Sequence, residues 1–280
     1  NWQWGWDETV KVVLDTTKSI LRIMEEYPEF KFSQSQASVY KILEEYAPRL
    51  LEEVKARVQE GRWEVSASTW VEADKNMPNG ESAARQILYA KKYLSQLLNI
   101  SMDDMVLDFE PDTFGHSAHV PEILKNAGIK YYYHCRGMND CNYQLYVWRA
   151  PSGAEVLANR ERNFYFVNVN PEMAFHAFST SELTGIKKTL HVYGVGDHGG
   201  GPTRRDVERL LDMDKWPIYP SFHLSTYREF FEAAEKFKEQ LPVYEGEINC
   251  IFDGCFTSQS RNKNGNKEAE ELLYKTEVFS

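Results

Sequence analysis

Residues 105–134 read MVLDFEPDTFGHSAHVPEILKNAGIKYYYH, and this segment changes twice between strand-like and helix-like patterns. An apolar run at 105–109 leads into a polar loop, then into a short helical pattern at 120–127, and then into a tyrosine-rich run at 129–134. Two apolar strands separated by a helix are typical of parallel strands joined by a crossover connection. The segment therefore predicts an α/β fold with a parallel sheet.

The same alternation continues on both sides of this segment. Strand-like runs lie at 30–35, 63–67, 187–193 and 247–252, and a hairpin is predicted at 146–158. Helical patterns lie at 10–24, 37–61 with a break at Pro48, 81–98, from 203 onward, 227–239 and 262–278. We expect a distorted or incomplete parallel β/α barrel at 1–258, followed at 259–280 by the first helix of a helical bundle.

Composition and charge exclude several classes of protein. The chain has 280 residues and a net charge of -10, with 32 basic against 42 acidic residues and no long basic run. Nucleic-acid binding requires a clustered cationic face, so no nucleic acid is expected as a partner. No apolar stretch approaches the ~18 residues of a membrane span, so no membrane is expected either. The four cysteines form no CxxC pair and predict free thiols in a cytoplasmic protein.

Two polar loops directly follow the strands of the opening segment, where sites form in parallel sheets. Asp112 in the first loop has the chemistry of a nucleophile or a metal ligand, although a turn in which it caps a helix fits the spacing equally well. Arg136 in the second loop can hold a carboxylate with two hydrogen bonds. An ordinary surface ion pair is the alternative for this arginine.

Two further loops contain reactive side chains. The glycine-rich loop 194–202 has neither nucleotide-binding fingerprint. It contains Asp197 and His198, which are candidates for acid–base chemistry or metal binding. The loop 252–259 contains Cys255, for which a buried inert thiol is a better interpretation than a nucleophile.

Four motifs together resemble one known family. In chain order they are WVEADKNMPNGE at 70–81, FEPDTFGHS at 109–117, YGVGDHGGGPT at 193–203 and GCFTSQSR at 254–261. They resemble the α-mannosidases of glycoside hydrolase family 38, and their order and spacing are similar to its bacterial and cytosolic branch. The resemblance covers essentially the whole chain. It corresponds to the N-terminal part of such enzymes, which continue through a helical bundle into large β domains.

The resemblance implies a retaining glycosidase that removes terminal α-linked mannose from oligosaccharides, with a bound divalent metal, usually zinc. Asp112 matches the nucleophile, which is also a metal ligand, and Asp197 matches the general acid/base. Arg136 matches the partner of the nucleophile. Trp2 matches the aromatic platform under the mannose, and Phe114 would line the same subsite. A retaining mechanism needs this pair of carboxyl groups, one to attack and one to protonate the leaving oxygen.

The chain departs from the family pattern in its metal ligands. The family has a His-x-Asp motif shortly before the tryptophan that Trp2 matches, and this chain begins at Asn1. Phe252 occupies the place of a further family histidine, and we infer that His198 replaces it as a ligand. We therefore expect a fragment with an incomplete metal site that binds zinc weakly and hydrolyses α-mannosides negligibly, with any homo-oligomer formed through domains that it lacks.

Two other functions remain open on the sequence. A metal-dependent polysaccharide deacetylase also has a distorted β/α barrel and Asp and His ligands, and it would release acetate instead of mannose. A non-catalytic carbohydrate-binding domain would bind mannose without hydrolysing it.

Overall fold

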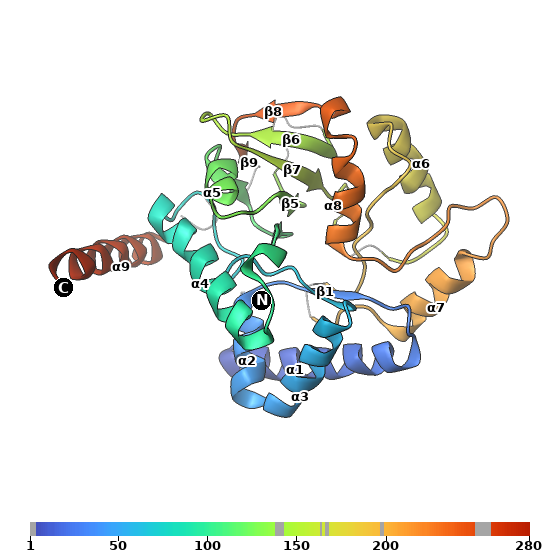
Figure 1. Ribbon diagram of the computed structural model, residues 1–280, viewed down its shortest axis with the longest axis horizontal. Coiled ribbons are helices and arrows are strands. Elements are labelled where there is room, and N and C mark those ends of the chain that lie inside the picture. The colour runs from blue at the N-terminus through green and yellow to red at the C-terminus, as the bar shows by residue number, and fades with distance from the viewer. Residues whose placement is uncertain (1–3, 138–142, 163, 166–167, 197–198, 250–258) are drawn as a thin grey trace.

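A computed structural model describes residues 4–137, 143–162, 164–165, 168–196, 199–249 and 259–280 (Figure 1). The N-terminal part contains a small parallel sheet and four helices. Its elements are α1 (Trp6–Glu26), β1 (Phe32–Gln34), α2 (Ala37–Tyr46), α3 (Pro48–Gln59), β2 (Trp63–Val65) and α4 (Gly80–Leu98). The predicted break at Pro48 is confirmed, because this proline is the first residue of α3, where its missing N–H costs nothing.

The first hydrophobic core lies between these helices and the β1–β2 pair. Ile20 of α1, Tyr40 of α2 and Trp63 of β2 are buried in it together with Leu94 of α4. The indole nitrogen of Trp63 donates a hydrogen bond to the Tyr40 hydroxyl at 3.1 Å. Because this buried polar pair satisfies itself, the large rings pack here without an unpaired donor.

The remaining elements build a second, larger sheet. They are η1 (Met102–Asp104), β3 (Leu107–Glu110), β4 (Gly115–His116), α5 (Val120–Asn126), β5 (Tyr131–His134), β6 (Leu145–Arg149), β7 (Glu155–Arg160), α6 (Met173–Thr184), α7 (Arg204–Met213), α8 (Tyr227–Glu235), η2 (Lys238–Gln240), β8 (Val243–Glu245), β9 (Ile248–Asn249) and α9 (Ser260–Phe279). The strand order is β3-β5-β7-β6-β8, with β4 and β9 forming a separate antiparallel pair.

The larger sheet is mostly parallel. Strands β3, β5 and β7 run parallel to one another, while β6 is antiparallel to β7 as part of the predicted hairpin. The three sheets formed by the described strands do not join into a closed barrel. The α/β class and the incomplete, distorted barrel are therefore confirmed.

Both faces of the larger sheet are covered by helices. Tyr131 and Tyr133 of β5 point to one face and pack with Phe231 of α8. Tyr132 points to the other face, where α4 and α5 pack against it through Ile87 and Leu124. Because successive side chains of a strand alternate between faces, the apolar YYY run is explained by a strand buried on both sides.

The fold differs from the prediction in its C-terminal half. The strand predicted at 187–193 is wrong, because this segment adds no strand to any of the three sheets. Leu190 and Val192 are partly buried and pack on the core that includes α8. Helix α6 was not predicted. Its Phe175 and Phe178 are exposed, so it lacks the apolar stripe that marks a helix in sequence.

The C-terminal helix α9 confirms the helix predicted at 262–278 and projects away from the rest of the chain beside α4 (Figure 1). None of its side chains is buried, and Leu272, Leu273 and Val278 are exposed. The domain boundary at 258 and the bundle beyond it stay predictions. No helix within the described residues has the length and apolarity needed to cross a bilayer.

Candidate active site

Asp112 and Arg136 meet at the carboxyl edge of the larger sheet. Asp112 follows β3, Arg136 follows β5, and the two strands are parallel neighbours. The Nε–H of Arg136 donates a hydrogen bond to Oδ1 of Asp112 in a partly exposed ion pair. The predicted contact is therefore confirmed. Asp112 caps no helix, since the chain continues into β4.

Two aromatic rings lie against the Arg136 guanidinium. The ring centroid of Phe114 lies 4.7 Å from its central carbon, and that of Phe164 lies 5.2 Å away. Both distances are within the range of a cation–π contact. Partial burial opposes the positive charge, but the hydrogen bond and the charge of Asp112 outweigh it and raise the pKa of Arg136. The guanidinium therefore stays charged beside the carboxylate.

Two buried histidines hold the backbone of Arg136. Its carbonyl oxygen lies 2.7 Å from Nδ1 of His134 and 3.3 Å from Nε2 of His116. A carbonyl only accepts, so these ring nitrogens carry the protons, and the opposite nitrogens accept from Tyr146 and Tyr132. Burial lowers the pKa of His134 to about 4 and that of His116 well below its usual value, so both rings are neutral.

Gly137 lets the chain turn at this point. Its φ of +90° lies in the left-handed region, and an added Cβ would come within 2.6 Å of the Ile248 side chain. Real Cβ atoms do not approach other atoms so closely, and a side chain at this φ would be strained. The glycine therefore allows β9 to pass directly beside Arg136.

The backbone of Asp112 is held by Glu72 from the motif at 70–81. A carboxylate oxygen of Glu72 accepts from the Asp112 N–H at 2.6 Å. The neighbouring Thr113 hydroxyl donates to Glu110 at 2.6 Å. Burial raises the pKa of Glu72 to about 7, with the negative charge of Asp112 adding to the rise. These contacts fix the loop that presents Asp112.

Lys75 neutralises the carboxylates beneath this loop. Its ammonium lies 3.0 Å from Asp108 and 2.7 Å from Glu110, and both acids are fully buried. Ser68 donates a further hydrogen bond to Asp108 at 2.7 Å. Burial raises the pKa of Glu110 well above its usual value, which the nearby Lys75 only partly offsets. The motif at 70–81 thus supplies two side chains that support the Asp112 loop.

Sequence reasoning missed Glu72, Lys75 and Phe164. The first two stand in a quoted motif, but spacing alone does not distinguish an inward-pointing charge from a solvated one. Their position in the loop that follows β2 was the one signal in the sequence that could have marked Glu72 and Lys75 as site residues. Nothing in the sequence around Phe164 distinguishes its ring from the many other aromatics.

The glycine-rich loop is closed by its own backbone. Val195 N–H donates to the Gly201 carbonyl at 2.9 Å, and Gly199 N–H donates to Gly196 at 2.8 Å. At Gly199, with φ +71°, an added Cβ would lie 3.3 Å from the Trp4 ring, so the N-terminal segment packs on this loop.

Several predicted residues lie outside the described part of the chain: Trp2, Asp197, His198, Phe252 and Cys255. The structure brings Asp112, Arg136 and Phe114 together, and the catalytic and binding roles of all the predicted residues stay predictions. Among the described residues, no group of three or more His, Cys, Asp or Glu side chains is placed to hold a metal ion. Cys135, which is described, is a buried free thiol.

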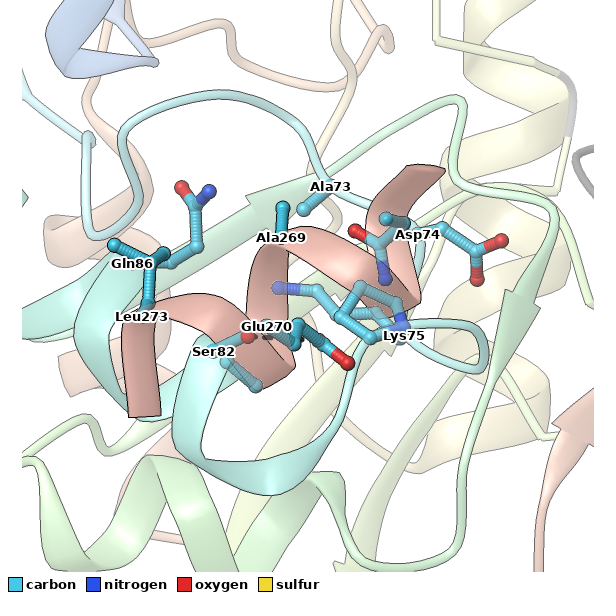
Figure 2. Close-up of a pocket in the computed structure, with 11 residues that line it drawn as sticks. Ala73, Asp74, Lys75, Ser82, Gln86, Ala269, Glu270 and Leu273 are labelled. Atoms are coloured by element: carbon cyan, nitrogen blue, oxygen red, sulfur yellow. Dashed lines mark hydrogen bonds between the residues drawn. The ribbon is translucent and has the colours of Figure 1, made fainter. Parts of the chain in front are cut away.

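A pocket of about 200 Å³ lies away from this pair, between α9 and the start of α4 (Figure 2). Lys75, Ser82 and Glu270 are among its lining residues. Glu270 of α9 accepts from the Asn79 N–H at 2.9 Å and from the Ser82 hydroxyl at 2.7 Å. The pocket therefore marks where α9 is attached and does not contain the Asp112–Arg136 pair.

The sequence of this chain matches a known protein family. Residues 1–247 match the family described as the Glycosyl hydrolases family 38 N-terminal domain. Alpha-mannosidase G of Dictyostelium discoideum is 30% identical over 286 aligned residues, covering 100% of this chain and 26% of the relative. Alpha-mannosidase 2C1 of Homo sapiens is 29% identical and is covered to 27%.

A solved structure shows the same fold. An alpha-mannosidase from Enterococcus faecalis V583 superposes with a TM-score of 0.74 at 21% identity, over 88% of this chain and 29% of that one. The chain thus spans about a quarter of the length of the curated relatives that it matches. Because the family match covers most of its length, the chain belongs to glycosyl hydrolase family 38, as an N-terminal domain of that family.

Proposed function

We propose that this chain carries the catalytic carboxylates of a retaining α-mannosidase, which hydrolyses terminal α-linked mannose in oligosaccharides. The observation that supports the proposal most strongly is the Arg136–Asp112 pair at the carboxyl edge of parallel strands. Membership of family 38 and the alpha-mannosidase relatives supply the substrate class. The buried free thiol of Cys135 fits the cytoplasmic location that we also propose.

In this proposal Asp112 is the nucleophile. Arg136 binds Oδ1, so Oδ2 is the oxygen that attacks the anomeric carbon as the glycosidic bond breaks. Asp197 gives its proton to the departing oxygen in this first step. It then takes a proton from the water that cleaves the ester between Asp112 and mannose, which releases the sugar with its original configuration.

Zinc binding through Asp112 and His198 is a further part of the proposal. The described residues alone do not fit a zinc site, because Asp112 is paired with Arg136 and no cluster of three donors is present among them. We therefore derive no catalytic step through a metal. With two protein donors most of the coordination sphere is left to water, so we expect weak binding. Elemental analysis after dialysis measures it, with His198→Ala compared against His119→Ala, an exposed histidine.

Hydrolysis of an aryl α-mannoside tests the proposed function. We expect the turnover of the chain, however low, to be lost in Asp112→Asn and kept in Asp15→Asn, the same chemical change at an exposed position of α1. Release of acetate from an acetylated polysaccharide, without mannose release, would establish a deacetylase. Mannose binding that Asp112→Asn leaves intact, with no turnover in the parent chain, would establish a binding domain.

A further inference from the structure

Three adjacent parallel strands end at the candidate site. Strand β3 leads to Asp112 and Phe114, and β5 leads to Arg136. Strand β7, which is parallel to β5, leads within four residues to Phe164. Phe164 therefore enters the site from a third strand end.

Phe164 has an unfavourable backbone conformation. Its φ of +87° lies in the left-handed region, which a bulky residue rarely adopts. Such conformations persist where the surrounding structure enforces them, and they cluster at functional sites. A glycine would adopt this φ without strain. We therefore infer that the aromatic ring of Phe164 makes contacts that offset the strain.

The ring of Phe164 contacts Tyr165 and Arg136. It stacks on Tyr165 with centroids 4.6 Å apart and an interplanar angle of 25°. Its centroid also lies 5.2 Å from the central guanidinium carbon of Arg136, close to the 4.7 Å distance of Phe114. Two rings from different loops therefore contact one cation.

The contacts of Phe114 and Phe164 with Arg136 bear on how well the Arg136–Asp112 ion pair is ordered. Both side chains are partly exposed, at 22% and 36%, and an exposed ion pair between flexible side chains is weak and poorly ordered. Aromatic rings against the planar guanidinium restrict its rotation and exclude water from one side. A ring at Phe164 therefore keeps the Nε–H directed at the carboxylate.

We propose that Phe164 is a positioning residue, which together with Phe114 clamps the Arg136 guanidinium so that its Nε–H stays bonded to Asp112. The catalytic meaning of the clamp rests on the proposed function, in which Asp112 is the nucleophile. The clamp itself is a property of the folded chain and is measurable without any substrate.

Solvent exchange of the Arg136 Nε–H tests the clamp. Its nitrogen-15 NMR resonance is identified by its loss in Arg136→Lys. We expect Phe164→Leu to exchange at least ~10-fold faster than the parent chain, because opening of the hydrogen bond exposes the proton. Phe164→Tyr, which keeps the ring, should stay within ~2-fold of the parent. Phe175→Leu, at an exposed phenylalanine of α6, is the matched control and should change nothing.

Phe164→Gly separates the ring from the backbone. Glycine relieves the strain at φ +87°, so this variant should fold with a Tm no lower than that of Phe164→Leu. If the ring is the clamp, Phe164→Gly exchanges as fast as Phe164→Leu. Fast exchange in Phe164→Leu alone would mean a distorted loop and would overturn the proposal, as would parent-like exchange in both variants.

Turnover of an aryl α-mannoside gives the second readout. A positioning role predicts a lower kcat with KM nearly unchanged in Phe164→Leu, and recovery of kcat in Phe164→Tyr. A raised KM with parent-like exchange would mean that the ring contacts the sugar, which contradicts the clamp. If the parent chain neither binds nor hydrolyses an α-mannoside, the proposed function fails, and the exchange measurement still tests the clamp.

Discussion

Asp112 and Arg136 occupy equivalent positions on two neighbouring parallel strands. Glu110 of β3 and His134 of β5 are register partners, and each member of the pair lies two residues beyond its strand. Parallel strands in this register carry the two loops to the same edge of the sheet. The ion pair is therefore a consequence of strand register, and both side chains need only short loops to meet.

The first prediction concerns Arg136→Ala. Removing the guanidinium leaves Asp112 without the donor that orients it, so we expect kcat on an aryl α-mannoside to fall by ~10²-fold or more. Arg136→Lys should recover little of this loss, since an ammonium does not reproduce the planar donor geometry. Thermal unfolding should show the Tm of the parent chain, because the pair is partly exposed. Equal turnover in Arg136→Ala and the parent would reduce the pair to a surface contact.

The second prediction concerns stereochemistry. If Asp112 and Asp197 act as nucleophile and acid/base, their carboxyl groups lie ~5–5.5 Å apart in the substrate-bound state, as in retaining enzymes. The first sugar released from an α-mannoside is then α-mannose, which proton NMR detects before mutarotation. An initial β-anomer would mean direct attack by water and would remove Asp112 from its nucleophilic role.

The third prediction concerns the buried charge of Lys75. Replacing it with methionine leaves Asp108 and Glu110 buried without their cation, so we expect Lys75→Met to lower the free energy of unfolding by about 3–5 kcal/mol. Lys55→Met is the control, since Lys55 pairs with an exposed glutamate and should change stability by less than about 1 kcal/mol. Urea unfolding measures both. Similar decreases in the free energy of unfolding of Lys75→Met and Lys55→Met would contradict the prediction, because the buried and the exposed lysine would then contribute equally to stability.

Sequence patterns predicted the elements whose signal is local. The hairpin around Gly153 and the helix break at Pro48 follow from turn chemistry, and both are present. The run at 187–193 is no strand among the described elements, because an apolar sequence pattern reports burial, whereas a strand also requires backbone partners along its length. The family resemblance paired Arg136 with Asp112, and their contact follows physically from the convergence of strand ends in a parallel sheet. Phe164 and Lys75 could not be assigned, since their contacts depend on which loops meet in space.

The last prediction concerns His191, whose two ring nitrogens are buried without a hydrogen-bond partner among the described residues. Burial lowers the pKa of His191 to about 4, with the nearby His176 adding to the effect. The unfolded chain, with a pKa near ~6.5, therefore binds more protons between pH 6.5 and 4, so stability is lost as the pH falls through this window.

His191→Leu removes this proton uptake from the unfolding equilibrium. We expect the variant to gain up to about 3 kcal/mol relative to the parent chain on going from pH 7 to pH 4, since each pKa unit corresponds to about 1.4 kcal/mol. Urea unfolding at several pH values gives the difference directly. His223→Leu, the same change at an exposed histidine, is the control for loss of an imidazole. Because the other buried histidines, His116 and His134, are common to all three proteins, their titration cancels in these comparisons. A pH-independent difference for His191→Leu would mean that the His191 ring reaches solvent and titrates as it does in the unfolded chain.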